Sequence, residues 1–242
     1  MYYGGYGYGL GRYGFYWDPT YILIIIGAVI TLMASARVKT TFHKYSRYNT
    51  HNGLTGEMAA RRILDSQGLY DVRVEPIRGE LTDHYDPRTK VVRLSEPVFH
   101  RSSIAAVGVA AHECGHAVQH AKGYVPLQIR SALVPVANFG AKFSWLMIIA
   151  GVLLSWNQTI LDLGILFFAA AVLFQIVTLP VEINASRRAV AILNNSGMVY
   201  EDEVSGVRKV LKAAALTYVA GAASSVLQLL RLVMLFGGRN RD

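Results

Sequence analysis

The stretch AAHECGHAVQH, residues 110–120, places His112 and His116 four positions apart, with Glu113 directly after the first histidine. On a helix both imidazoles lie on one face, a turn apart, and can reach a single metal ion. Glu113 can then contact a water on that ion without being a ligand. Two nitrogen donors, a position for water and an adjacent base are what a zinc peptidase requires. The stretch predicts a helix with the metal ligands His112 and His116 and the catalytic base Glu113.

The surrounding run, residues 102–123, predicts one long helix that is capped by Ser102 or Ser103 and ends near Gly123. His120 continues the spacing, but three ligands from one straight helix cannot surround a tetrahedral ion, so we expect a supporting or surface role. Cys114 points away from the metal face and should be a buried small hydrophobe. The alternative interpretation of the motif is a pair of core-facing histidines without a metal.

A third metal ligand has to come from another part of the chain. The metzincin pattern would need glycine at 119 and histidine at 122, where this chain has Gln119 and Lys122, so that class is excluded. Asp162 lies near the far end of an apolar stretch, and residues 201–203 resemble a solvated charge run at a helix start. Glu182 follows an apolar stretch on the side predicted for the two histidines. It is the preferred third ligand; the alternative is a plain surface glutamate.

The composition places part of the chain in a bilayer, since 52% of its 242 residues are hydrophobic. The fourth apolar stretch contains Gln228 and Arg231, so an interfacial helix is its alternative interpretation. We therefore expect three to four transmembrane helices, after a Gly/Tyr-rich tail at residues 1–18. The predicted spans are residues 19–36, 137–156, 159–179 and 216–236.

The distribution of charge predicts the topology. Basic residues follow the first span closely, so the positive-inside rule places residues 37–136 in the cytoplasm, and residues 180–213 return to that side. Arg239 and Arg241 disagree with this scheme if the fourth stretch spans. The net charge of +8 is carried mostly by Lys and Arg beside the apolar runs, which favours the lipid bilayer and no nucleic acid as partner. The single cysteine excludes an intrachain disulfide and a Cys-rich metal site.

The region from 37 to 136 has the patterns of a small α+β domain. Residues 54–68 predict an amphipathic helix with Thr55 as a possible N-cap and an end at Gly68. Residues 70–77 and 90–95 alternate like strands, and residues 84–90 (HYDPRTK) predict a loop or hairpin turn. The strand at 90–95 precedes the motif helix, so we expect it to offer an edge to an extended substrate.

Several motifs occur in order along nearly the whole chain: DPTYILII, KTTFHKYS, LTDHYDPRTKVVRLSEPVF, HECGHAVQHA, LPVEINASRRA and ALTYVAGAASSVLQLLRL. In these motifs the chain resembles the YugP-type membrane zinc metallopeptidases, which are distantly similar to the HtpX-like proteases. The resemblance implies a multi-pass peptidase of the bacterial inner membrane, a gluzincin whose zincin-like domain faces the cytoplasm. It implies one zinc per chain, bound by His112, His116 and Glu182, with Glu113 as base. The HtpX-like pattern has an aspartate where this chain has Ser186, which leaves Asn184 and Ser186 as candidates to orient a ligand histidine.

The expected chemistry is hydrolysis of polypeptides, which would include unfolded or membrane-protein segments, with Glu113 accepting the proton of the attacking water. The candidates for a transition-state donor are His84, Tyr85, Arg187 and Arg188. A catalytically silent membrane scaffold with structural zinc is the main alternative. A zinc enzyme that acts on a non-peptide amide or a lipid is a third interpretation, which would use the same site residues. A membrane-protein partner or a homo-oligomer is compatible with the sequence.

Overall fold

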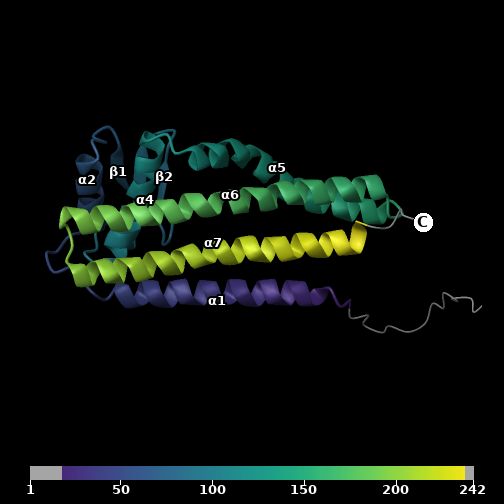
Figure 1. Cartoon of the computed structure of the whole chain (residues 1–242), viewed down its shortest axis with the longest axis horizontal. Coiled ribbons are helices and arrows are strands. Elements are labelled where there is room, and N and C mark those ends of the chain that lie inside the picture. Colours follow the sequence, from purple (N-terminus) through teal and green to yellow (C-terminus); the bar gives the residue numbers. More distant parts are fainter. Residues whose placement is uncertain (1–17, 238–242) are drawn as a thin grey trace, which may run out of the picture.

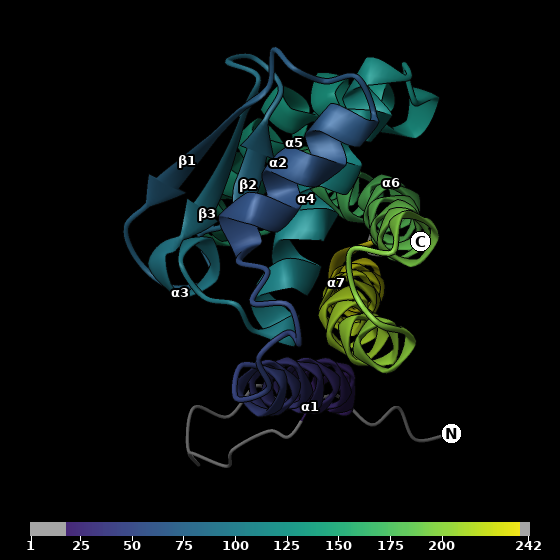
Figure 2. The same ribbon diagram turned by 90° about the vertical axis from the view of Figure 1, so that its left-hand side faces the viewer.

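The computed structural model describes residues 18–237, so all of the predicted tail except Asp18, and also Arg239 and Arg241, lie outside the described residues. Four long helices run side by side: α1 (Tyr21–Tyr45), α5 (Val125–Leu153), α6 (Gln158–Ser196) and α7 (Glu201–Phe236) (Figure 1). Each is long and apolar enough to cross a membrane. Figure 2 shows α1, α7 and α6 stacked in a column.

A smaller unit lies at one end of the long helices (Figure 1). It consists of α2 (Gly56–Ser66), β1 (Arg73–Ile77), β2 (His84–Asp86), β3 (Val91–Ser95), α3 (Glu96–Phe99) and α4 (Ile104–Ala121). The prediction of a mainly helical membrane protein with a small α+β part is confirmed.

The long helices do not end where the apolar stretches end. α1 continues past Ala36, and α5 begins at Val125 rather than at residue 137. α5 contains Pro135, and Figure 1 shows it changing direction along its length, as expected of an interior proline. α6 passes through Pro180 without a break in the helix. Charges mark where apolar surface ends, whereas backbone hydrogen bonding can continue beyond that point.

α7 accommodates the arginine that weakened the prediction of a fourth span. Its apolar part packs along α1 and α6 (Figure 1). The Arg231 side chain, 12% exposed, lies 3.5 Å from the Asp18 carboxylate and over the Tyr21 ring at the start of α1. An arginine with a carboxylate partner at a helix end is compatible with a spanning helix. The structure therefore favours four candidate spans.

The sheet has the order β1-β3-β2, with β1 parallel and β2 antiparallel to β3. The strands predicted at 70–77 and 90–95 are confirmed as β1 and β3. Residues His84–Asp86 were predicted as part of a turn but form β2, because three residues are too few to show alternation and the Asp-Pro signal follows at once. The prediction that residues 90–95 form an edge is wrong: β3 is central, and β1 and β2 are the edge strands.

The predicted helix boundaries within this unit are confirmed. Thr55 caps α2 through its side chain and Gly68 has a positive φ of 73°. Ser103 caps α4, accepting a 3.2 Å hydrogen bond from the Ala106 amide, and Gly123 follows the helix with a φ of 61°. Cys114 is fully buried, as predicted.

Glu203 departs from the solvated charge run predicted for residues 201–203. It is 1% exposed and accepts hydrogen bonds from the backbone amides of Tyr200 and His51 at 2.7 Å. It thereby fixes the start of α7 to the segment that follows α1. Its neighbours Glu201 and Asp202 are exposed.

Candidate metal centre

Two helices from distant parts of the chain bring three potential metal ligands together. α4 supplies His112 and His116, and α6 supplies Glu182, which is 2% exposed. Glu182 Oε2 lies 3.2 Å from His112 Nε2 and 3.5 Å from His116 Nε2, and the candidate ligand atoms all lie within 4.8 Å of one another. A tetrahedral zinc ion with bonds of about 2.0–2.2 Å separates its ligand atoms by about 3.3–3.6 Å. The donor set and its spacing therefore fit zinc.

The second nitrogen of each histidine also has a partner. His112 Nδ1 lies 3.1 Å from Ser186 Oγ, and His116 Nδ1 lies 3.0 Å from Gln119 Oε1. Such contacts fix the ring orientation and, when the oxygen accepts a hydrogen bond from Nδ1–H, leave Nε2 free for a metal. Ser186 therefore occupies the orienting role that was open in the sequence, whereas Asn184 contacts neither histidine directly.

Gln119 connects the two helices behind His116. It is fully buried, and its amide group donates to the Val181 carbonyl at 2.8 Å and to Asn184 Oδ1 at 3.0 Å. Arg188 Nε donates to the same Asn184 oxygen at 2.7 Å. The chain of contacts from Arg188 through Asn184 and Gln119 to His116 holds this histidine against α6.

The carboxylates influence the charge state of His116. Burial alone would lower the pKa of His116, but its hydrogen bond with Glu182 and the negative charges of Glu113 and Glu182 raise that pKa above its ordinary value. A site that attracts positive charge at this position is suited to a cation.

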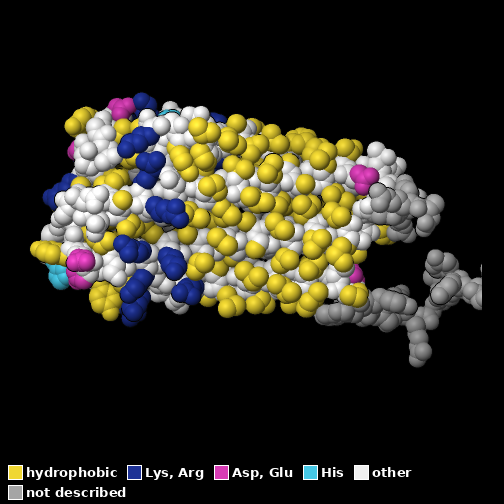
Figure 3. Space-filling model, viewed as in Figure 1, with side chains coloured by type: hydrophobic (Ala, Val, Ile, Leu, Met, Phe, Trp, Pro, Cys, Tyr) yellow, Lys and Arg dark blue, Asp and Glu magenta, His cyan; other side chains and the backbone are white. Residues whose placement is uncertain are grey.

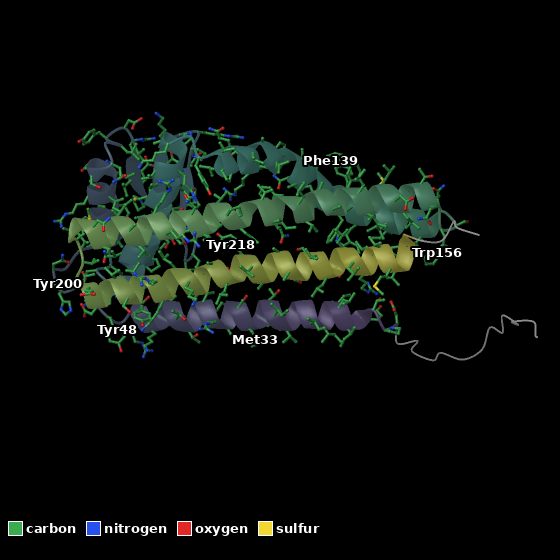
Figure 4. The ribbon with its side chains drawn as sticks, viewed as in Figure 1. Met33, Tyr48, Phe139, Trp156, Tyr200 and Tyr218 are labelled. Carbon is green, nitrogen blue, oxygen red and sulfur yellow. The ribbon has the colours of Figure 1, made fainter. Side chains whose placement is uncertain are left out.

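A pocket of about 150 Å³ contains this cluster. Glu113, 8% exposed, lines the pocket beside the two histidines and Glu182. The remaining walls come from β2 and the loop before it, from α5, and from Tyr218 on α7 (Figure 4). These lining residues are Asp83, His84, Tyr85, Pro87, Leu127, Arg130, Ser131 and Tyr218.

The four predicted transition-state donors divide into two pairs. His84 and Tyr85 line the pocket, and the Tyr85 hydroxyl lies 2.9 Å from Nδ1 of the exposed His120. Burial raises the pKa of Tyr85 to about 12, so its hydroxyl keeps its proton at neutral pH. Arg187 and Arg188 do not line the pocket. Arg188 instead belongs to the Asn184 contacts, and its guanidinium lies 5.8 Å from the centre of the Tyr124 ring.

Three residues near the site were not singled out from the sequence. Gln119 was used only to exclude the metzincin pattern, Arg130 lies in a segment without a motif, and Tyr218 occurs within the stretch ALTYVAGAASS. Arg130 Nε is buried and has no hydrogen-bond partner within residues 18–237. Tyr218 lies next to Glu182 and interacts with its carboxylate. Only the packing of α5 and α7 against α6 could reveal these two residues.

Gly115→Ala should disturb the site by separating the helices that carry the ligands. A Cβ at Gly115 would lie 2.5 Å from the Ala185 carbonyl oxygen of α6, in the backbone beside Ser186. Overpacking of this kind costs about 1–3 kcal/mol, so the melting temperature and the zinc content of the variant should both fall. Gly221→Ala is the matched control, because the nearest atom to its Cβ would be 3.7 Å away. Equal zinc content and melting temperature in the two variants would contradict the close-packing argument.

Comparison with known proteins agrees with this geometry. Residues 20–237 match the family described as "Putative neutral zinc metallopeptidase". The chain is 50% identical over 224 residues to "Putative membrane protease YugP" of Bacillus subtilis (strain 168). The aligned region covers 92% of this chain and 99% of that protein. No solved structure matches. The chain therefore belongs to this neutral zinc metallopeptidase family.

Proposed function

We propose that the protein is a membrane-embedded, zinc-dependent endopeptidase of the gluzincin type that takes part in the processing or quality control of membrane proteins. His112, His116 and Glu182 would bind one zinc ion per chain, and Glu113 would be the general base. The observation that carries this proposal is the ligand cluster with Glu113 in the same pocket, at one end of four apolar helices.

The proposed mechanism assigns proton transfer to Glu113. When bound, zinc supplies Lewis-acid polarisation of the scissile carbonyl and acidifies water. Glu113 takes a proton from the attacking water and then delivers it to the departing amine. Ser186 and Gln119 keep the ligand histidines oriented through Nδ1. The low exposure of Glu113 and Glu182 limits competition from bulk water.

Tyr218 and Arg130 are our proposed donors to the oxyanion that forms on the scissile carbonyl. Both line the pocket, and each can direct an O–H or N–H group toward the reacting carbonyl without being a metal ligand. Arg130 Nε, which is buried without a hydrogen-bond partner in the described part of the chain, supports a polar contact with substrate. His84 and Tyr85 of β2 remain candidates for contacts with the substrate on the opposite wall.

Tyr218→Phe should lower kcat by about 100-fold while zinc content stays unchanged, since one oxyanion donor is removed and His112, His116 and Glu182 are all kept. Single-turnover cleavage of a fluorogenic peptide, together with zinc analysis, measures both quantities. Tyr48→Phe is the control, because Tyr48 is 53% exposed and does not line the pocket of the metal centre. An unchanged kcat in Tyr218→Phe would remove Tyr218 from the mechanism.

The geometry of β2 suggests how a polypeptide would bind. β2 is a terminal strand of the sheet, and its residues His84 and Tyr85 line the pocket. An extended peptide that pairs with the free edge of β2 would pass beside His112 and Glu113. Recognition through backbone hydrogen bonds tolerates varied side chains, which suits unfolded or membrane-protein segments as substrates.

The charge distribution supports a location in the bacterial inner membrane with the site facing the cytoplasm. Figure 3 shows a band of Lys and Arg side chains between the apolar surface of the long helices and the end that carries the small domain. The positive-inside rule places such a band on the cytoplasmic side.

The number of clustered ligands argues against a purely structural zinc site. Structural sites are almost always formed by four protein ligands, but within residues 18–237 the cluster holds three. A site with three ligands, a nearby carboxylate and a pocket is arranged as catalytic zinc sites are.

The test is cleavage of an unfolded fluorogenic protein by purified enzyme in detergent, with and without a zinc chelator. We expect cleavage that stops on chelation and returns when zinc is added. A preparation that holds zinc but cleaves no protein would contradict the peptidase, and hydrolysis of lipid amides by the same preparation would assign it to that substrate class instead.

A further inference from the structure

A second cavity lies along α6 and α7, close to the metal centre but separate from its pocket. It is an open groove of about 650 Å³ between α6 and α7. Aliphatic side chains form much of its lining, among them Ile183 and Val190 from α6 and Leu211 from α7. The groove is far larger than the pocket at the metal centre and shares with it none of the proposed ligands.

Three cations line this apolar groove: Arg187 from α6, and Arg208 and Lys212 from α7. Arg208 and Lys212 are four residues apart, so they occupy one face of α7. All three side chains are exposed. None forms an ion pair or a side-chain hydrogen bond with any residue between 18 and 237. Three neighbouring cations without carboxylate partners are complementary to a phosphate group.

The position of the groove indicates the source of that phosphate. On α6 the groove begins at Ile183, shortly after the apolar stretch 159–179, and on α7 it ends at Ala215, where the apolar stretch 216–236 begins. The basic band in Figure 3 crosses the long helices at this boundary. A molecule in the groove would thus have its anionic part beside the cations and its apolar part continuing along the membrane-facing helices. A phospholipid has this construction, whereas a soluble phosphate has no apolar part.

We propose that the groove between α6 and α7 is a binding site for an anionic phospholipid. Arg187, Arg208 and Lys212 hold its phosphate, and an acyl chain passes Ile183 and Ala215 toward the apolar stretches of α6 and α7. Ser186 also lines the groove, and its hydroxyl contacts His112. The bound lipid is therefore one side chain away from the metal centre.

Native mass spectrometry of the full chain in detergent, with added phosphatidylglycerol or phosphatidylcholine, tests this site. The wild type should retain phosphatidylglycerol in preference to phosphatidylcholine. The triple variant Arg187→Gln, Arg208→Gln, Lys212→Gln should bind phosphatidylglycerol more weakly by about fivefold per cation, on the order of 100-fold in total. Because these side chains are exposed and have no ion-pair or side-chain hydrogen-bond partner among the described residues, the variant should keep the wild-type melting temperature.

The matched control removes the same charge from α1 at the same boundary: Arg37→Gln, Lys39→Gln, Lys44→Gln. This variant should retain phosphatidylglycerol as the wild type does. An equal loss of phosphatidylglycerol binding in both triple variants would show that general surface charge causes the effect and would overturn the proposed site. Competition by inorganic phosphate or glycerol phosphate at the concentration of the lipid would show an anion site without lipid recognition and would refute the proposal. Equal retention of the two lipids by the wild type would refute it as well.

Discussion

Glu113→Gln should abolish peptide cleavage, with a loss of at least about 1,000-fold, and should leave one zinc per chain in place. Glutamine fills the same volume but cannot accept the proton of the attacking water. Glu113 is not part of the ligand cluster, so its replacement leaves His112, His116 and Glu182 unchanged. The measurement is the initial rate of cleavage of an unfolded protein, together with elemental analysis of the same preparation.

Glu57→Gln is the control for this substitution, because Glu57 is an exposed glutamate in the first turn of α2. It should cleave at the wild-type rate. A Glu113→Gln variant that retains more than a tenth of the activity would exclude Glu113 as the base. Loss of zinc from the same variant would instead indicate that Glu113 is itself a ligand.

The sequence was sufficient to predict the parts of the site that depend on local spacing. His112, Glu113 and His116 lie on one helix, so a four-residue interval determines their relative positions. The cap at Ser103 and the end near Gly123 follow from the conformational preferences of single residues. The proximity of Glu182 to the two histidines was also predicted, because the predicted topology places the end of the third span on the same side of the membrane as the motif helix.

The parts that were missed depend on how helices pack. Gln119 reaches Val181 and Asn184 because Gly115 lets α4 approach the backbone of α6 closely. No local pattern encodes that approach. Arg187 and Arg188 were predicted as candidate transition-state donors, but neither lines the pocket: Arg187 lines the groove between α6 and α7, and Arg188 contacts Asn184. Proximity along a helix does not determine which neighbour a side chain faces.

The strand order could not be predicted from the sequence for a related reason. Residues 90–95 directly precede the motif helix, which suggested an accessible edge, yet β2 pairs with β3 and occupies that edge. The pairing depends on three residues whose pattern is dominated by the following turn. The consequence bears on the site, since the edge strand that lines the pocket is the one that carries His84 and Tyr85.

Glu182→Ala should weaken zinc binding by more than about 100-fold, beyond the loss of 10- to 100-fold typical when a residue that orients a ligand is removed. Two histidines would remain, and two ligands bind zinc poorly. Cleavage should be lost with the metal. Zinc affinity can be measured by competition with a chromogenic chelator, and Ser186→Ala should give the smaller loss, because it removes the hydroxyl beside His112 Nδ1 and no ligand.

Glu203→Gln distinguishes loss of a ligand from loss of the fold. Glu203 is as buried as Glu182, but it accepts backbone hydrogen bonds at the start of α7, away from the histidines. Its replacement should lower the melting temperature and leave zinc affinity unchanged. Glu182→Ala should instead lower zinc affinity and leave the melting temperature of the metal-free protein unchanged. If Glu182→Ala keeps its zinc, the third ligand must be another group in the pocket. Glu113, a carboxylate on the same helix as both histidines, then becomes the first residue to test.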